Sequence, residues 1–129
     1  MTQQEIFERY LMAGLSTDAS AQAEMFTADG VYEAPLLPPG SPLPRRLVGH
    51  EQLREGFPAY HRAAEGGGGM RPDFDKSRVE VHSTADPEVF VVELDTVLTD
   101  GTDSVTMSLV QIFRLRAGKI ALLRDYFTW

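Results

Sequence analysis

Hydrophobic residues in the first half of the chain recur every three or four positions, which is the spacing of one face of an α-helix. Residues 4–14 place Phe7 and Tyr10 on one such face, so we predict a first helix there. The Ser-Thr-Asp cluster at residues 16–18 supplies side chains that cap the N-terminus of a helix well. We therefore predict a second, short helix that runs from this cluster to Phe26.

A third helix is predicted from residue 49 onward. Its apolar face carries Leu53, Phe57 and Tyr60, again at helical spacing. Pro58 lies within this segment, and a proline inside a helix removes one backbone hydrogen bond and clashes with the preceding turn. We expect this proline to kink or shorten the helix.

The second half of the chain changes to the alternating pattern of β-strands. Segments 79–83, 89–98, 105–115 and 120–127 are rich in β-branched and apolar residues and are separated by turn residues. A shorter strand is expected at residues 31–34. Helices followed by an antiparallel run of strands indicate an α+β fold, in which one sheet face packs on the helices. We expect the long strands to curl around a small-molecule pocket.

Two segments have compositions that favour loops. Residues 35–46 contain five of the eight prolines of the chain. Gly66 to Gly69 are four consecutive glycines, which have no side chains to pack and are conformationally permissive. We expect both segments to lie over the pocket as a lid.

Length and composition limit the possible classes of protein. The 129 residues suit one domain, so we expect residues 1–129 to form a single unit. The net charge of −7 does not favour binding to nucleic acid. No apolar run approaches the ~20 residues that a membrane-spanning helix needs. The lack of a signal pattern and of cysteine fits a cytoplasmic protein.

Side chains alternate between the two faces of a strand, so the last strand can be divided by parity. Leu123, Asp125 and Phe127 share one face. An acid among apolar neighbours costs free energy unless it is paired. Asp125 is therefore either a surface acid beside Arg124 or a pocket carboxylate that acts as a general base.

Other polar residues are candidates to meet Asp125 inside the sheet. Glu93 and Asp95 lie two residues apart on one strand face. As a pocket pair they would raise each other's pKa, whereas on a solvated face they would be ordinary surface acids. Gln111 is either a core amide or a neutral donor to a substrate oxygen. The residues expected to line the pocket and contact the substrate are Tyr10, Gln111, Phe127, Met107, Leu109 and Phe57.

The three histidines do not form a metal-binding motif. His50, His61 and His82 show no His-x-x-x-His spacing, and the chain has no cysteine. The glycine run lacks the preceding strand and the Lys-Ser/Thr ending of a phosphate-binding loop. We therefore predict neither a metal nor a cofactor.

Three stretches resemble the SnoaL-like branch of the nuclear transport factor 2-like superfamily. They are Met-Phe-Thr-Ala-Asp-Gly-Val-Tyr at residues 25–32, Gly-His-Glu-Gln-Leu at 49–53, and the ending Gly-Lys-Ile…Arg-Asp-Tyr-Phe at 118–127. The resemblance implies a homodimer and a cone-shaped fold, in which three N-terminal helices pack against a curved, mainly antiparallel mixed sheet. It leaves the function open, because this fold hosts isomerases, cyclases, hydrolases and non-enzymes.

Locally the chain is most similar to the limonene-1,2-epoxide hydrolase subfamily. The resemblance implies that Asp125 and Tyr32 activate and position a water molecule, and that Asp95 protonates the epoxide. Glu93 stands where that subfamily has the arginine between its two acids, and Ala34 replaces its water-binding asparagine. These two departures weaken the case for ordinary epoxide hydrolysis.

The chain also resembles ketosteroid isomerase, with Tyr10 matching its oxyanion-side tyrosine. The proton-shuttling aspartate of that enzyme falls on Ala34 and its second acid on Gln111, so steroid isomerisation is not expected. The resemblance to phenazine-biosynthesis relatives of the fold implies that Glu93 is an internal acid. SnoaL-type polyketide cyclases use a pocket aspartate as acid and base without a cofactor, which is the role expected for Asp125.

We therefore expect a cofactor-independent enzyme that acts on an apolar, oxygenated, polyketide- or terpenoid-like small molecule by cyclisation, isomerisation or epoxide hydrolysis. Asp125 would be the base and Glu93 or Asp95 the partner acid, while Tyr32 and Gln111 would orient water or a substrate oxygen. The alternative is a non-catalytic ligand-binding or interaction module of the same fold. Acids that converge in a deep cavity would favour the enzyme, whereas a filled core with these acids in solvent would favour the module.

Overall fold

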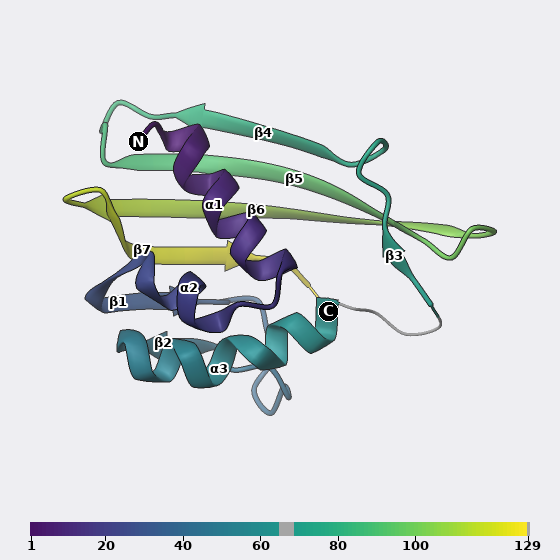
Figure 1. Cartoon of the computed structure of the whole chain (residues 1–129), viewed down its shortest axis with the longest axis horizontal. Coiled ribbons are helices and arrows are strands. Elements are labelled where there is room, and N and C mark those ends of the chain that lie inside the picture. The colour runs from purple at the N-terminus through teal and green to yellow at the C-terminus, as the bar shows by residue number, and fades with distance from the viewer. Residues whose placement is uncertain (65–68, 129) are drawn as a thin grey trace.

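The computed structural model describes residues 1–64 and 69–128 of the chain. Within these residues the helices are α1 (Gln3–Leu15), α2 (Ala19–Glu24) and α3 (Gly49–Ala64). The strands are β1 (Phe26–Glu33), β2 (Arg46–Val48), β3 (Arg71–Pro72), β4 (Arg78–Ser83), β5 (Val89–Thr99), β6 (Ser104–Arg116) and β7 (Lys119–Tyr126). Figure 1 shows how these elements are arranged.

The strands form a mixed sheet in the order β2-β1-β7-β6-β5-β3, and β4 also pairs with β5. From β4 to β7 each strand pairs antiparallel with the next, so the predicted meander is confirmed. β1 pairs parallel with β7, although these strands come from opposite ends of the chain. This parallel pair places the N-terminal half of the chain beside the last strand and thereby positions the candidate site.

The helices cover one face of the sheet (Figure 1), and the core lies between the two layers. Phe7 and Tyr10 of α1 both meet the ring of Phe113 on β6 edge-on, with centroids 6.2 and 5.7 Å away. Phe57 of α3 packs against Phe26 of β1 at 5.9 Å. Aromatic pairs of this kind contribute ~0.5–1.5 kcal/mol beyond the burial of their surface. The α+β fold class that the sequence predicts is thus confirmed.

The second helix ends earlier than we predicted. Asp18 caps α2 as expected, because its side chain accepts a hydrogen bond from the backbone N–H of Ala21 at 3.0 Å. Phe26, however, begins β1 instead of ending α2. Its backbone pairs with Ile120 of β7 and its ring is completely buried, so sheet pairing and burial outweigh the helical spacing of the local sequence.

Pro58 does not shorten α3, so this one of the two effects that we expected of the proline is absent. The helix continues to Ala64, and Phe57 and His61, on either side of the proline, are both buried. Burial of a large apolar side chain contributes ~1.5–3 kcal/mol, which is comparable with the ~3 kcal/mol that a proline inside a helix costs. Packing against the core therefore holds this helix together.

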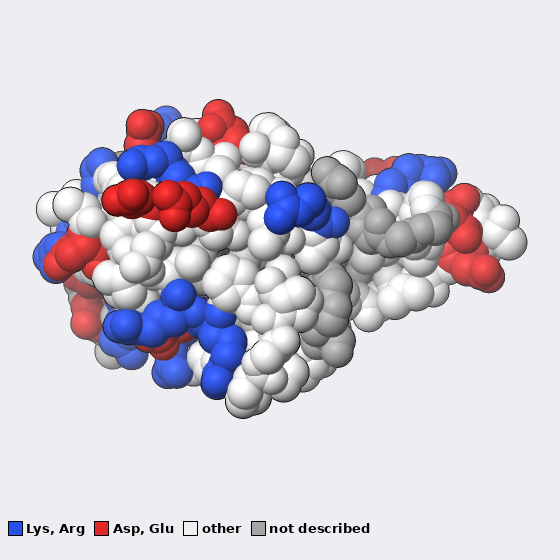
Figure 2. Space-filling view, turned by 90° about the horizontal axis from the view of Figure 1, so that it is seen from below, with Lys and Arg blue, Asp and Glu red and all other residues white. Residues whose placement is uncertain are grey.

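The charged surface is mixed in sign. Figure 2 shows small groups of basic and acidic side chains on the face seen from below, separated by wide uncharged areas. The described residues therefore form no continuous basic surface on this face of the kind that follows a nucleic-acid backbone. Within residues 1–64 and 69–128, every helix is too short or too polar to cross a membrane.

Candidate active site

Asp125 lies on the face of β7 that points into the core. Its neighbours on this face, Leu123 and Phe127, are buried, and Asp125 itself is only 8% exposed. The parity predicted for the last strand is therefore confirmed. No lysine or arginine within the described residues forms an ion pair with Asp125. The carboxyl group is thus buried without an ion pair to a lysine or an arginine.

Tyr32 is the hydrogen-bond donor to this carboxyl group. Its hydroxyl donates to Oδ2 of Asp125 over 2.6 Å. The contact follows from the parallel pairing of β1 and β7, because Tyr32 lies opposite Leu123 and Asp125 is the next residue of β7 on the same face. Tyr32 is itself buried, so water has little access to the pair. A short hydrogen bond of this kind is among the strong ones when its acceptor is ionised.

Burial raises the pKa of Asp125 to about 6, since removing the carboxylate from water disfavours its charged form. The Tyr32 hydroxyl and the Gln111 amide act in the opposite direction, because they stabilise the carboxylate. Burial, together with the nearby charge of Asp125, raises the pKa of Tyr32 well above its ordinary value. At neutral pH Asp125 is therefore mostly ionised, and Tyr32 is a neutral donor.

Two buried acceptor atoms of this site have no hydrogen-bond donor among the described residues. They are Oδ1 of Asp125 and Oε1 of Gln111. The two residues lie directly opposite each other on β7 and β6, so their side chains leave the sheet side by side on the same face. Because buried acceptors without a donor are costly, Oδ1 of Asp125 requires a hydrogen bond, either from the NH2 group of Gln111 turned toward it or from a donor outside the chain.

Aromatic side chains enclose the buried acid. The ring of Tyr32 meets Phe57 at 5.5 Å and Tyr60 at 5.0 Å between centroids, both edge-on. Tyr60 in turn meets Phe127 edge-on at 6.3 Å. The Tyr60 hydroxyl donates to the backbone carbonyl of Pro44. This arrangement ties the C-terminal part of α3 to both β1 and the proline-rich segment.

Tyr60 is a residue of the site that sequence reasoning missed. Burial, and to a lesser extent the charge of Asp125, raise its pKa to about 12, while the nearby Tyr32 acts in the opposite direction. The helical spacing already placed Tyr60 on one face with Leu53 and Phe57. The sequence does not show that this face of α3 packs against β1. The helical spacing alone therefore could not place Tyr60 near Asp125.

Tyr10 belongs to the same buried cluster. Burial and the nearby charge of Asp125 raise its pKa well above the ordinary value, and a hydrogen bond with Gln22 opposes this shift. Gln22 also pairs with His61, with 2.7 Å between Oε1 and Nε2. Sequence reasoning missed this pair, because the two residues lie 39 positions apart and no local pattern connects them.

Glu93 and Asp95 do not join Asp125. Both are exposed on the opposite face of the sheet, away from the helices. Glu93 accepts from Nε2 of His82 at 2.7 Å, and Asp95 accepts from the hydroxyl of Ser108 at 2.7 Å. The expectation that three acids converge is therefore wrong, and so is the internal position implied for Glu93.

The core-facing positions of β5 are the alternate ones, and they carry Phe90, Val92 and Leu94. Val92 lies opposite Gln111, which in turn lies opposite Asp125, so these three share one face across three strands. An offset of one residue in a strand moves a whole set of side chains from the core to solvent. Glu93 and Asp95 therefore occupy the intervening, exposed positions of β5.

The remaining predicted lining residues lie on the core side of the sheet. Phe57 and Phe127 are buried, whereas Met107 and Leu109 are half-buried on the same face of β6 as Gln111. Their contact with a substrate stays a prediction.

The two predicted lid segments differ in what the structure describes. In the proline-rich segment Leu37 and Leu43 are buried, so this part of the chain packs onto the body of the protein, and Arg46 begins β2. Residues 66–68 of the glycine run lie outside the described residues.

A surface hollow of about 490 Å³ lies elsewhere, between α1, α2 and the turn that joins β6 to β7. Its lining includes Ile6, Met25 and Lys119 but neither Asp125 nor Tyr32. Around Asp125 itself, within the described residues, packed aromatic side chains occupy the place where we expected an enclosed pocket.

A family profile described as the SnoaL-like domain matches residues 7–123. The chain belongs to the SnoaL-like domain family. The matched region includes Tyr32 and Gln111 and ends two residues before Asp125. A search by sequence finds no match among curated proteins.

Solved structures of similar fold include enzymes. A protein of ketosteroid isomerase-like fold from Catenulispora acidiphila, in complex with trimethylamine, is 16% identical, with a TM-score of 0.64 over 99% of this chain and 88% of that one. An LEH-like epoxide hydrolase from M. tuberculosis is 23% identical, with a TM-score of 0.56 over 96% and 80%. SalBIII, an epoxide hydrolase/cyclase-like enzyme with a role in pyran ring formation in the polyether salinomycin, is 24% identical, with a TM-score of 0.63 over 97% and 89%. These likenesses show a shared fold.

Proposed function

We propose that this SnoaL-like chain is a cofactor-independent enzyme in which Asp125 acts as the general base on an apolar, oxygenated small molecule. The observation that carries the proposal is the state of the Asp125 carboxyl group. One oxygen is held by Tyr32, the other has no donor among the described residues, and burial raises the pKa to about 6. A base with a pKa near the working pH is efficient in proton transfer.

Each residue of the site has a distinct role in this proposal. Oδ1 of Asp125 removes a proton from a carbon or hydroxyl group of the substrate and later returns it. Tyr32 positions the carboxyl group through its hydrogen bond to Oδ2. Gln111, directly opposite Asp125, orients a hydroxyl or carbonyl oxygen of the substrate with its amide. All three act within a single domain of residues 1–129.

A single buried acid favours isomerisation or cyclisation over epoxide hydrolysis. Asp125 is the one buried carboxyl group among the described residues, because the core-facing positions of β5 nearest to it carry Val92 and Leu94. In isomerisation or cyclisation one group can take up a proton and deliver it again. Hydrolysis by the pair of acids found in limonene-1,2-epoxide hydrolases needs a second carboxyl group on the same face.

Access to Asp125 requires that Tyr60 moves. Its half-buried ring packs between Tyr32 and Phe127, and its hydroxyl is bonded to the carbonyl of Pro44 in the proline-rich segment. We propose that this segment and Tyr60 open together to admit an apolar substrate, as a lid would. Closure would then remove water from the site, which strengthens the electrostatic interactions within it.

The alternative function is a non-catalytic ligand-binding or interaction module. The closely packed aromatic side chains around Asp125 and the exposure of Glu93 and Asp95 favour it. The two functions differ in what they require of Asp125: the enzyme needs its charge, whereas a module needs only the shape of the side chain.

We expect the enzyme to convert at least one member of a panel of polyketide-like ketones, hydroxy-ketones and terpenoid epoxides. Asp125→Asn keeps the size of the side chain and a hydrogen-bond acceptor for Tyr32 but removes the base. Its kcat/KM should fall by ~10²–10⁴-fold, the range typical of a lost general base. Product formation is followed by mass spectrometry at pH 7.5, and the fold of each variant is checked by circular dichroism.

Glu88→Gln is the matched control, because Glu88 is an exposed acid outside the core. It should retain the activity of the original chain. Equal turnover by Asp125→Asn and the original chain would refute the assignment of the base, and a panel with no turnover at all would favour the module.

We also propose that the chain forms a homodimer, which the family resemblance implies. The face of the sheet away from the helices carries Val110, which is 36% exposed, and the half-buried Ile112 and Tyr126. Apolar side chains on an uncovered sheet face are typical of protein interfaces. A single-chain mass in light scattering at high protein concentration would contradict this part of the proposal.

A further inference from the structure

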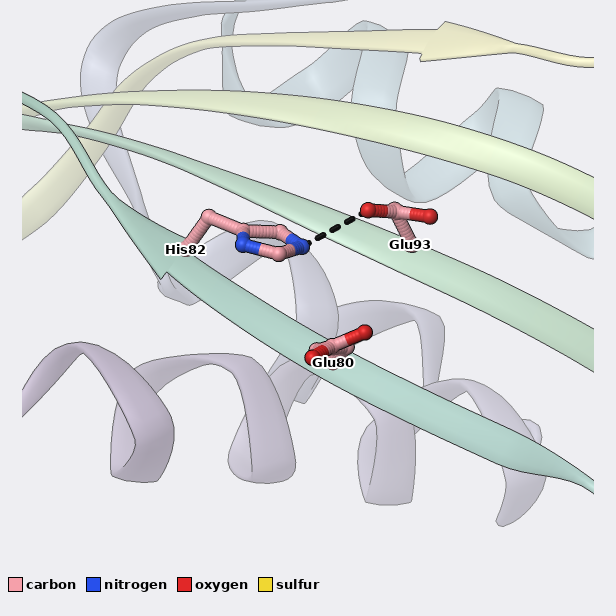
Figure 3. Close-up of side chains that lie close together, drawn as sticks. All are labelled: Glu80, His82 and Glu93. Carbon is pink, nitrogen blue, oxygen red and sulfur yellow. Dashed lines mark hydrogen bonds and ion pairs between the residues drawn. The ribbon is translucent and has the colours of Figure 1, made fainter.

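The face of the sheet away from the helices carries a cluster of one histidine and two glutamates. Glu80 and His82 come from β4 and Glu93 comes from β5, and Figure 3 shows the imidazole of His82 directed toward Glu93. All three side chains are exposed, and one donor atom from each lies within 4.8 Å of the others. The cluster lies on the opposite face from Asp125, so it is separate from the proposed active site.

We propose that Glu80, His82 and Glu93 bind a divalent first-row transition-metal ion such as Zn²⁺. Strand pairing fixes the origin of all three ligands. Glu80 lies directly opposite Glu93 in the antiparallel ladder, and His82 is two residues further along β4 on the same face. Because the backbone of a paired sheet is rigid, the ligands need no ordering of a loop before they bind.

The spacing of the three donor atoms suits one small ion. The three donor atoms lie at most 4.8 Å apart, so they fit within a circle whose radius is 4.8 Å divided by √3. An ion at the centre of this circle would be within about 2.8 Å of every donor atom. The usual distance from zinc to a nitrogen or carboxylate oxygen ligand is ~2.0–2.2 Å. Side-chain rotations that move each donor by less than about 1 Å close this difference. The exposed side chains are free of the packing that would oppose such rotations.

The charges of the cluster favour a cation. Two carboxylates directly opposite each other on neighbouring strands repel. His82 bonds to Glu93, but the carboxylate of Glu80 has no hydrogen bond or ion pair with any described residue. Arg78, two residues before Glu80 on the same face, lies opposite Asp95 and forms no ion pair with Glu80. A divalent ion would offset the repulsion and satisfy Glu80.

The donor set also indicates which ion is preferred. One imidazole and two carboxylates suit zinc and its neighbours in the first transition row, whereas magnesium and calcium prefer all-oxygen sites. Glu93 lies opposite Val110, at the margin of the proposed dimer surface, whereas Glu80 and His82 lie one strand further out on β4, where water can complete the coordination. The sequence shows no motif for this site, because Glu93 is distant from Glu80 and His82 along the chain. Only the pairing of β4 with β5 brings the three residues together.

The test is zinc binding to tag-free, metal-free protein by isothermal titration calorimetry. We expect saturable binding of one Zn²⁺ per chain and a rise in the unfolding temperature when Zn²⁺ is added. His82→Ala and Glu93→Gln should each weaken binding by at least about tenfold, with unchanged circular dichroism. Mg²⁺ at the same concentration should not bind measurably.

Two matched variants separate this site from unspecific binding. Glu88→Gln removes an exposed acid outside the cluster, and His50→Gln removes a histidine whose Nε2 contacts the backbone carbonyl of Phe26. Both should bind Zn²⁺ like the original chain. The proposal is overturned if no saturable binding occurs, if His82→Ala binds as tightly as the original chain, or if the affinity is lost in His50→Gln instead.

Discussion

Asp125 couples the chemistry of the candidate site to the stability of the fold. Its pKa is about 6 in the folded chain, against an ordinary value of 3.8, so the folded state binds the proton more tightly than the unfolded state. The stabilisation that protonation provides is fully present below pH 3.8 and is lost as the pH rises through about 6. Above this range the buried carboxylate costs roughly 3 kcal/mol, at about 1.4 kcal/mol per pKa unit.

The substitution Asp125→Asn should remove this pH dependence, because asparagine stays neutral throughout. We expect the free energy of unfolding of the variant, relative to the original chain, to rise by about 2–3 kcal/mol between pH 4 and pH 7.5. Urea denaturation at a series of pH values measures the difference, in which the titration of other groups cancels. A difference that stays constant over this range would show that the folded-state pKa of Asp125 is not raised.

At the scale of elements, the close approach of α3 to β2 holds the wall of the site in place. Gly56 lies on α3 against Leu47 of β2, and a Cβ at position 56 would overlap both methyl carbons of Leu47, 2.6 Å from Cδ1. Leu47 is buried, so it has little space to move away. The glycine therefore lets the helix lie close enough for Phe57 and Tyr60 to reach Tyr32.

We expect Gly56→Ala to destabilise the fold by about 1–2 kcal/mol. Overpacking in a tight contact costs typically ~1–3 kcal/mol, and the better helix propensity of alanine returns at most ~1 kcal/mol. Glu55→Ala, at the exposed neighbouring position, is the control and should change the stability by less than about 0.5 kcal/mol. Thermal and urea unfolding measure both variants, and a Gly56→Ala chain as stable as the control would contradict this view of the contact.

The elements themselves could largely be predicted from the sequence, because helical spacing, the cap at Asp18 and strand alternation are local patterns. The short strands β2 and β3 could not be predicted, because β2 has only three residues and β3 only two, which is too few to show alternation. The inward face of β5 could not be predicted either. Glu93 and Asp95 are flanked by Val91 and Val97 on their own face, so both faces of this strand contain apolar residues.

At the scale of the whole molecule, the parallel pairing of β1 with β7 determines which residues meet. It brings Tyr32 to Asp125 across 93 positions of the chain, a contact that no local pattern indicates. The family resemblance nevertheless led us to expect Tyr32 beside Asp125, because the resemblance carries three-dimensional information. The same resemblance placed Asp95 in the site, whereas the pairing of β5 with β6 turns Asp95 to the exposed face of the sheet.

The fold places the two proposed sites on opposite faces of one sheet. The helix-covered face holds Asp125 among aromatic rings, whereas the open face holds Glu80, His82 and Glu93. Because the two groups share no side chain, the proposed base and the proposed metal site can be removed independently. Loss of Zn²⁺ binding in His82→Ala should therefore leave the pH dependence caused by Asp125 unchanged.

The central claim is that Asp125 is a buried carboxyl group that is ionised at neutral pH and titrates near the range in which enzymes use a general base. The most direct measurement is the ¹³C NMR titration of its carboxyl carbon, assigned by comparison with Asp125→Asn, because it requires no substrate. We predict a midpoint at about pH 6. A midpoint near the ordinary value of 3.8 would contradict the account, since it would mean that the carboxyl group is solvated and not held in the core with Tyr32.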